Sequence, residues 1–135
     1  MTPGTLARIA GATSLLFGSA GLVAPEAFAT AFGVRLDAFD LALARLACAS
    51  YVGFGALNWL TRDITDARAW GAITAGNAVS WVVSAAVVIQ AMLLGLGQPT
   101  TLLLVALQLG YAGAWAAMYV RVSRAPESAE SPRDG

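Results

Sequence analysis

The amino-acid sequence predicts an all-α, polytopic membrane protein, a bundle of four transmembrane helices. Hydrophobic residues make up 58% of the 135-residue chain and charged residues only 12%, against about 45–50% and about 25% in soluble domains. Four segments each hold the roughly 20 apolar residues that cross a hydrocarbon core of about 30 Å as a helix. We therefore predict one transmembrane domain over residues 1–122 and a disordered cytoplasmic tail over residues 123–135, where the chain becomes charged and rich in proline.

The first predicted span covers residues 6–24 and stops at Pro25. Residues 25–33 form a second, short helix in this prediction, with proline in its first turn and glycine as its cap. Because Phe28 and Phe32 share one face, we expect this helix to lie at the membrane surface.

A signal peptide is the rival interpretation of the chain's start. Arg8, the apolar run behind it and the tripeptide Ala27-Phe-Ala29 fit a cleavable leader. The small residues on one face of the span favour its retention, because such a face packs against neighbouring helices.

The remaining predicted spans cover residues 39–61, 69–95 and 101–120. The connection over residues 62–68 is short and charged, which predicts an antiparallel hairpin, and the link over residues 97–100 is tighter still.

Arginine asymmetry predicts the orientation in the membrane. One side carries Arg8, Arg62, Arg68, Arg121 and Arg124, whereas Arg35 is the one arginine in a loop on the other side. Cytoplasmic loops are enriched in positive charge, so both termini are expected in the cytoplasm of a multi-pass protein of the cell (inner) membrane. All cations are arginine and alanine is abundant, a composition typical of a GC-rich bacterial genome.

The residue types that usually carry chemistry are scarce. The chain has no histidine, its single cysteine is Cys48, and apart from Asp40 at the very start of the second span the predicted spans contain no carboxylate. A haem, zinc or dithiol centre is therefore not expected, and we predict no catalytic residue, cofactor or metal. The formal net charge is zero, so no nucleic-acid partner is expected either.

Small residues recur at helical spacing and predict the packing faces, since helices in lipid associate through close backbone approach. Two further stripes combine polar and aromatic residues, and they either pack as a core or leave a gap lined for a small molecule. The residues predicted to pack helices are Gly11, Gly18, Gly53, Asn77 and Gly113. The mixed stripes are Trp70, Thr74, Asn77, Trp81 and Ser84 on the third span, and Gln108, Tyr111, Trp115 and Tyr119 on the fourth.

Three polar residues, Arg45, Gln90 and Gln108, lie inside spans at about one depth below the outer surface. One interpretation is an outward polar pocket in which the amides hold the arginine fork to bind an anion. The other is that Arg45 reaches the headgroups or pairs with Asp40 or Glu26, while the glutamines bond to nearby backbone.

The stretch from Ala24-Pro-Glu-Ala-Phe to Phe-Gly-Val34 and the second span, residues 44–62, resemble small bacterial four-helix membrane proteins grouped as DoxX-like. Arg45, Gly53, Gly55 and Arg62 match the pattern by position. The resemblance implies a fold and a membrane address, and it defines no catalytic residue.

Three functions follow from these features. The first is a non-enzymatic subunit or scaffold of a membrane complex, with a membrane-protein partner or further copies of itself on the small-residue faces. The second is a binder or transporter of a small amphipathic molecule or anion. The third, a membrane enzyme acting on lipid or quinone, is disfavoured by the missing histidine, lysine and intramembrane carboxylates.

Overall fold

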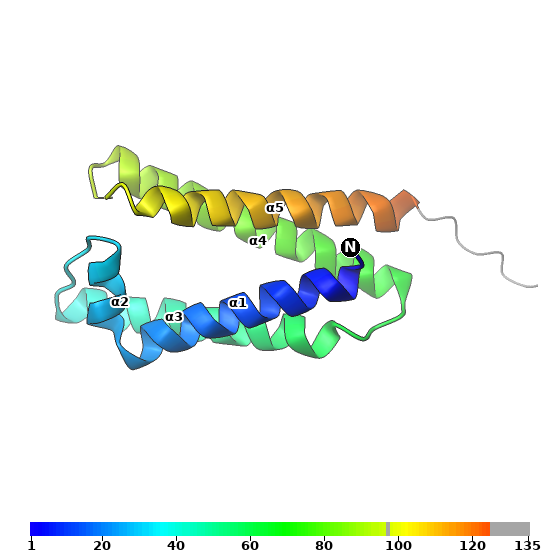
Figure 1. Ribbon diagram of the computed structural model, residues 1–135, viewed down its shortest axis with the longest axis horizontal. Helices are drawn as coiled ribbons and strands as arrows, with labels where there is room; N and C mark the ends of the chain where they lie inside the picture. Colours follow the sequence, from blue (N-terminus) through cyan, green and yellow to red (C-terminus); the bar gives the residue numbers. More distant parts are fainter. Residues whose placement is uncertain (97, 125–135) are drawn as a thin grey trace, which may run out of the picture.

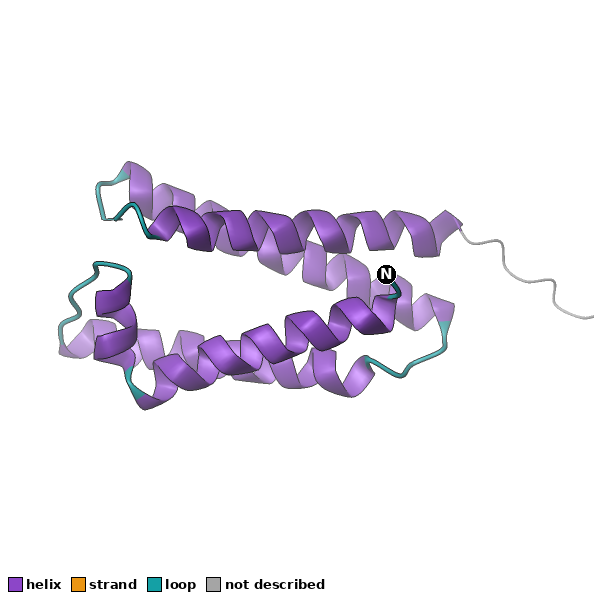
Figure 2. Cartoon of the chain, in the orientation of Figure 1, coloured by secondary structure: helices purple, strands orange, loops and turns teal. Residues whose placement is uncertain are grey.

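Five helices make up the computed structural model, which describes residues 1–96 and 98–124 (Figure 1). They are α1 (Pro3–Val23), α2 (Pro25–Ala31), α3 (Ala38–Thr61), α4 (Ala67–Leu93) and α5 (Thr101–Arg124). The all-helical fold class is confirmed, and Figure 2 shows helices joined by short loops with no strand in the described ranges. Because α5 continues to Arg124, the helix passes the predicted domain end at residue 122. Residues 125–135, which hold most of the predicted tail, lie outside the described residues.

The four long helices are 21 to 27 residues long and apolar enough to cross a membrane. At about 1.5 Å of rise per residue, each covers about 30 Å or more. By length and composition the chain is thus a multi-pass membrane protein with α1, α3, α4 and α5 as its spans.

Polar caps mark where the spans begin. The Thr2 hydroxyl accepts a hydrogen bond from the amide of Thr5 at the start of α1, and the Asp66 carboxylate accepts one from the amide of Ala69 at the start of α4. Asp37 and Asp40 form a reciprocal capping box at the start of α3. Such caps satisfy amides that have no partner within the helix, so the charges of the loops also define the helix ends.

The four spans pack as two antiparallel pairs. α1 lies along α3, and α4 lies along α5. Contact between the pairs is made mainly by α1 and α5. Figure 1 shows the pairs close together near the N-terminus and farther apart toward the end that carries α2. The bundle is therefore a wedge rather than four equally spaced helices.

The core lies where the two pairs meet. Leu6, Ala7 and Ala10 of α1 are buried against Trp115 and Met118 of α5, all with less than 5% of their surface exposed. Small residues on α1 let the large indole of Trp115 reach the axis of the bundle, where it is fully covered. In lipid this contact is stabilised by dispersion and close fit rather than by exclusion of water.

Glycine brings α1 and α3 into backbone contact. A Cβ atom added to Gly11 would lie 3.1 Å from the carbonyl oxygen of Gly55, and one added to Gly18 would lie 2.8 Å from the carbonyl oxygen of Cys48. Gly11 and Gly18 thus both lie where two helix backbones pack closely, as the small-residue spacing predicts. Gly55, which the sequence did not single out for packing, is the buried glycine of α3.

Gly53 and Gly113 do not pack helices within this chain, which corrects the sequence prediction for both. Each is exposed, and a Cβ atom added to either would meet no atom within 4 Å. The cause for Gly53 is helix rotation, because Gly55 lies about 200° farther around the helix and faces α1 instead. Asn77 is buried, but its amide donates to the Ile73 carbonyl of its own helix at 2.9 Å rather than to a neighbouring helix.

Candidate binding cavity between the helix pairs

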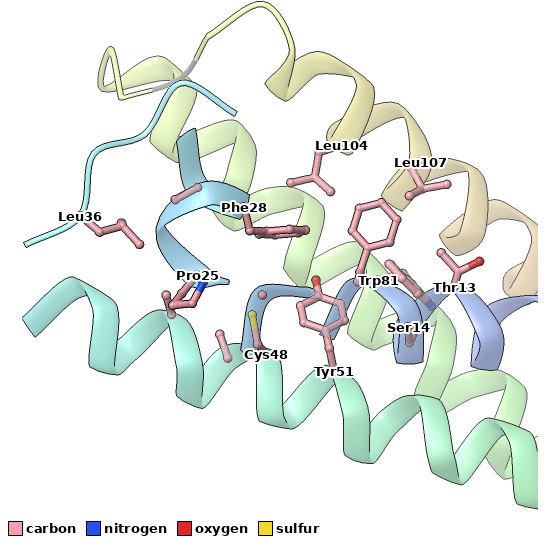
Figure 3. A pocket seen from close by; sticks show the side chains of 15 residues that line it. Thr13, Ser14, Pro25, Phe28, Leu36, Cys48, Tyr51, Trp81, Leu104 and Leu107 are labelled. Atoms are coloured by element: carbon pink, nitrogen blue, oxygen red, sulfur yellow. The ribbon is translucent and has the colours of Figure 1, made fainter. Parts of the chain in front are cut away.

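A cavity of about 230 Å³ fills the wide end of the wedge (Figure 3). Both helix pairs contribute to its wall, together with α2 and the loop that follows it. The wall consists of Thr13, Ser14, Phe17, Gly21, Pro25, Phe28, Ala29, Leu36, Ala44, Ala47, Cys48, Tyr51, Trp81, Leu104 and Leu107. A dry cavity of about 150 Å³ takes up benzene, so this one has room for a larger molecule.

The short helix α2 closes one side of the cavity. The ring of Phe28 meets Phe17 of α1 edge to face, with centroids 5.9 Å apart, and Phe32 at 5.3 Å. Pro25 is the first residue of α2, so Ala24 alone separates α2 from the end of α1. The predicted short helix is thus present, and Phe28 on its aromatic face lines the cavity.

Aromatic rings form the opposite, inner end. Trp81 of α4 stacks on Tyr111 of α5, with centroids 4.7 Å apart and ring planes 20° apart. Tyr51 and Phe54 of α3 approach the same indole at 6.3 Å and 6.1 Å. Rings from three spans therefore separate the cavity from the core, and in Figure 3 Leu36 lies at the other end.

A hydrogen bond between side chains of the two pairs lies beside this inner end. The hydroxyls of Thr13 on α1 and Tyr111 on α5 are 2.8 Å apart. Hydrogen bonds of this kind help to hold helices together in lipid. This bond therefore fixes α1 against α5 at the point where the pairs separate.

The cavity is suited to an uncharged and mostly apolar molecule. None of the described residues that line it carries a charge. Ser14 Oγ and Trp81 Nε1 are covered atoms without a hydrogen-bond partner in the described part of the chain. Tyr51 is partly exposed, and no hydrogen bond to its hydroxyl occurs among the residues that the structure describes. Concave apolar walls with few polar groups are typical of small-molecule sites.

The structure does not assemble the predicted polar cluster of Arg45, Gln90 and Gln108. Arg45 and Gln90 are exposed, whereas Gln108 is 2% exposed with its Oε1 atom unpaired. Within residues 1–96 and 98–124, no hydrogen bond joins any two of the three. The prediction rested on a shared depth in the sequence, but depth does not determine which way each helix faces.

Arg45 also lacks the alternative ion pairs in the described ranges, although it lines a shallow hollow beside Glu26 and Pro25. The Asp40 carboxylate accepts the Asp37 amide at 3.2 Å in the capping box instead. The structure therefore leaves Arg45 at the surface near the start of α2, and Arg45 is not among the residues that line the cavity between the helix pairs.

The two mixed stripes were predicted either to pack as core or to line a gap, and most of their residues are in the core. Trp70, Thr74 and Asn77 are buried, as are Gln108 and Trp115, so this part of the stripes is core. Farther along α4, Trp81 belongs to both the core and the cavity wall. The stripes therefore pack mostly as core, with Trp81 as their one member among the lining residues of this cavity, and Tyr119 is exposed.

Sequence reasoning missed the residues that α1, α2 and α3 contribute to the wall, notably Phe17, Phe28, Cys48 and Tyr51. Their helical spacing was visible: Ala44, Cys48 and Tyr51 recur every three or four residues on one face of α3.

No metal-binding group of three or more His, Cys, Asp or Glu residues occurs in the described ranges. No protein-family model, curated protein or solved structure matches the chain. The DoxX-like resemblance accordingly stays a prediction, and the geometry of the cavity carries the functional argument.

Proposed function

We propose that the protein binds one small, uncharged and largely apolar molecule in the cavity between its helix pairs, without transforming it. The observation that carries this proposal is the charge-free hollow of about 230 Å³ at the wide end of the wedge. Its wall comes from both pairs and from α2, so binding would link parts of the chain that otherwise touch little.

The wall supports binding rather than catalysis. Hydroxyl groups and the thiol of Cys48 face or border the cavity, but no histidine, carboxylate or amine accompanies them among the lining residues. A nucleophile without a neighbouring base is weakly reactive. An anion is also a poor fit here, because burying its charge without a cation nearby is costly.

The proposed address is the cell membrane of a bacterium, with both termini in the cytoplasm. Arg8 near the start of α1, Arg62 and Arg68 between α3 and α4, and Arg121 and Arg124 at the end of α5 all belong to one end of the bundle. This asymmetry supports the orientation. The DoxX-like resemblance supports a bacterial membrane family without an assigned reaction.

A second candidate function is that of a subunit in a membrane complex. Gly110 and Gly113 lie on the outer side of α5, where an added Cβ atom would meet nothing within 4 Å. A smooth outer stripe lets a helix of another protein, or of a second copy, approach closely. The first and second functions are compatible, since the cavity and this stripe use different surfaces.

Native mass spectrometry of the protein released from mild detergent tests the proposed binding. The wild-type chain should retain one uncharged molecule, and Ala44→Phe should lose it, because Ala44 lines the cavity and an added phenyl ring would occupy much of its space. Ala42→Phe is the matched control, with the same change on an exposed site of α3 outside the wall.

Loss of the bound molecule in Ala44→Phe together with its retention in Ala42→Phe supports a site in the cavity. A wild-type protein that carries no molecule, or equal retention in both variants, would refute it. Extraction and chromatography of the released molecule would then give its identity.

A further inference from the structure

We infer that the Tyr51 hydroxyl is the group that selects the ligand, and that the ligand is an apolar molecule with one hydrogen-bonding oxygen, such as a ketone. This inference rests on the proposed function. It adds that the oxygen of the ligand lies beside α3, between Phe28 and the ring of Trp81, while the remaining apolar part fills the space toward Leu36 and Leu104.

The position of Tyr51 is the first step. Tyr51 is one of the lining residues, and its ring leans toward Trp81 with centroids 6.3 Å apart. Figure 3 shows the ring rising from α3 with its hydroxyl directed into the space below Phe28. The aromatic body of the residue is thus part of the wall, and its polar tip faces the cavity.

The other side-chain oxygen and nitrogen groups of the wall are engaged or covered. The Thr13 hydroxyl is within 2.8 Å of the Tyr111 hydroxyl. Ser14 Oγ and Trp81 Nε1 have almost no accessible surface, so a molecule in the cavity does not reach them without a rearrangement. The Tyr51 hydroxyl has neither restriction, because it is not among the covered side-chain atoms and no described residue bonds to it.

A phenol without a partner is unfavourable inside a membrane. Buried tyrosine hydroxyls usually find a hydrogen-bond partner, and lipid tails offer none. A phenolic O–H is a hydrogen-bond donor, so it can donate to a neutral acceptor. A ligand oxygen supplies that acceptor, whereas a hydrocarbon of the same shape leaves the hydroxyl unsatisfied.

A matched pair of probes separates these two cases. 1-Indanone and indane have the same fused rings and differ by one carbonyl oxygen. We would measure both by equilibrium dialysis of nanodiscs that hold the full chain against empty nanodiscs of the same lipid, which corrects for partition into lipid. A second variant, Tyr119→Phe, controls for loss of a hydroxyl, because Tyr119 is exposed on α5 outside the cavity wall.

In the wild-type protein, 1-indanone should bind about 2- to 10-fold more tightly than indane, the range that one net hydrogen bond supplies. Tyr51→Phe keeps the ring and should abolish this preference while indane binding stays the same. Tyr119→Phe should keep the preference.

Two results would overturn the inference in different ways. If both probes bind and Tyr51→Phe leaves their ratio unchanged, the selection by Tyr51 is wrong while binding in the cavity stands. If neither probe binds the wild-type protein in excess of empty nanodiscs, the proposed function fails together with the inference.

Discussion

At the scale of single residues, the same amino acid has opposite roles on different helix faces. Gly18 lies against the backbone of α3, where an added Cβ atom would be 2.8 Å from Val52 N. Gly113 belongs to an equally regular stripe on α5 but faces outward with no atom near it. Spacing therefore identifies a smooth face, and the contact partner of that face depends on the rotation of the helix.

This difference predicts the outcome of a pair of matched substitutions. Gly18→Leu should destabilise the protein by about 1–3 kcal/mol or more, because a side chain in a filled interface forces the backbones apart. Gly113→Leu should leave the stability of the isolated chain within about 0.5 kcal/mol. Thermal unfolding in one detergent would compare the two variants, and equal loss of stability would show that α5 is packed differently.

For the polar residues inside spans, too, the contact partner depends on the rotation of the helix. The sequence predicts that Arg45, Gln90 and Gln108 carry a free-energy cost inside spans, and it also predicts their depth. Their partners are not, because each sits on a different helix whose facing direction comes from packing elsewhere. Gln108 turned inward with the Tyr111 and Trp115 face of α5, while Arg45 stayed at the surface.

At the scale of elements, the spans were predictable within a few residues because their signal is cumulative. About 20 apolar residues between charged or capping residues leave little freedom for the ends, and Asp37 and Asp66 mark the starts of α3 and α4. The short helix α2 was also predictable from Pro25 and Gly33. Its role was not, since Phe28 packs on Phe17 and closes the cavity.

This role of α2 predicts that Phe28→Ala weakens ligand binding. Removing the ring opens the cavity toward the membrane surface and forfeits its contacts, so affinity should fall by about tenfold, equivalent to about 1.4 kcal/mol. Phe39→Ala is the control, because Phe39 is 71% exposed at the start of α3 and does not line the cavity. Dialysis with 1-indanone provides the measurement, and equal binding by both variants would show that α2 does not close the site.

At the scale of the whole molecule, the arrangement of two helix pairs separates a packed end from a hollow end. Trp115 fills the axis near the N-terminus, whereas the rings of Tyr51, Trp81 and Tyr111 form a boundary beyond which the pairs diverge. The number of spans followed from hydropathy. The wedge shape could not be predicted from hydropathy, because the angle between the helix pairs depends on how large and small residues of α1 and α5 fit together.

The orientation of the whole molecule predicts the result of reporter fusions. Fusions after residue 124 and within residues 62–68 should report the cytoplasm, and a fusion next to Arg35 should report the opposite side, because arginine is retained on the cytoplasmic side. A combined phosphatase and fluorescent-protein assay measures each fusion. An outside location for the end of α5 would reverse the proposed topology.

The most direct test of the central claim is electron cryomicroscopy of the protein in nanodiscs, with a bound antibody fragment to make the small particle visible. We expect non-protein density between the helix pairs, bounded by Phe28, Tyr51 and Leu104. This expectation would be contradicted by a map in which the pairs are parallel, Phe28 and Leu104 touch, and no space remains between them.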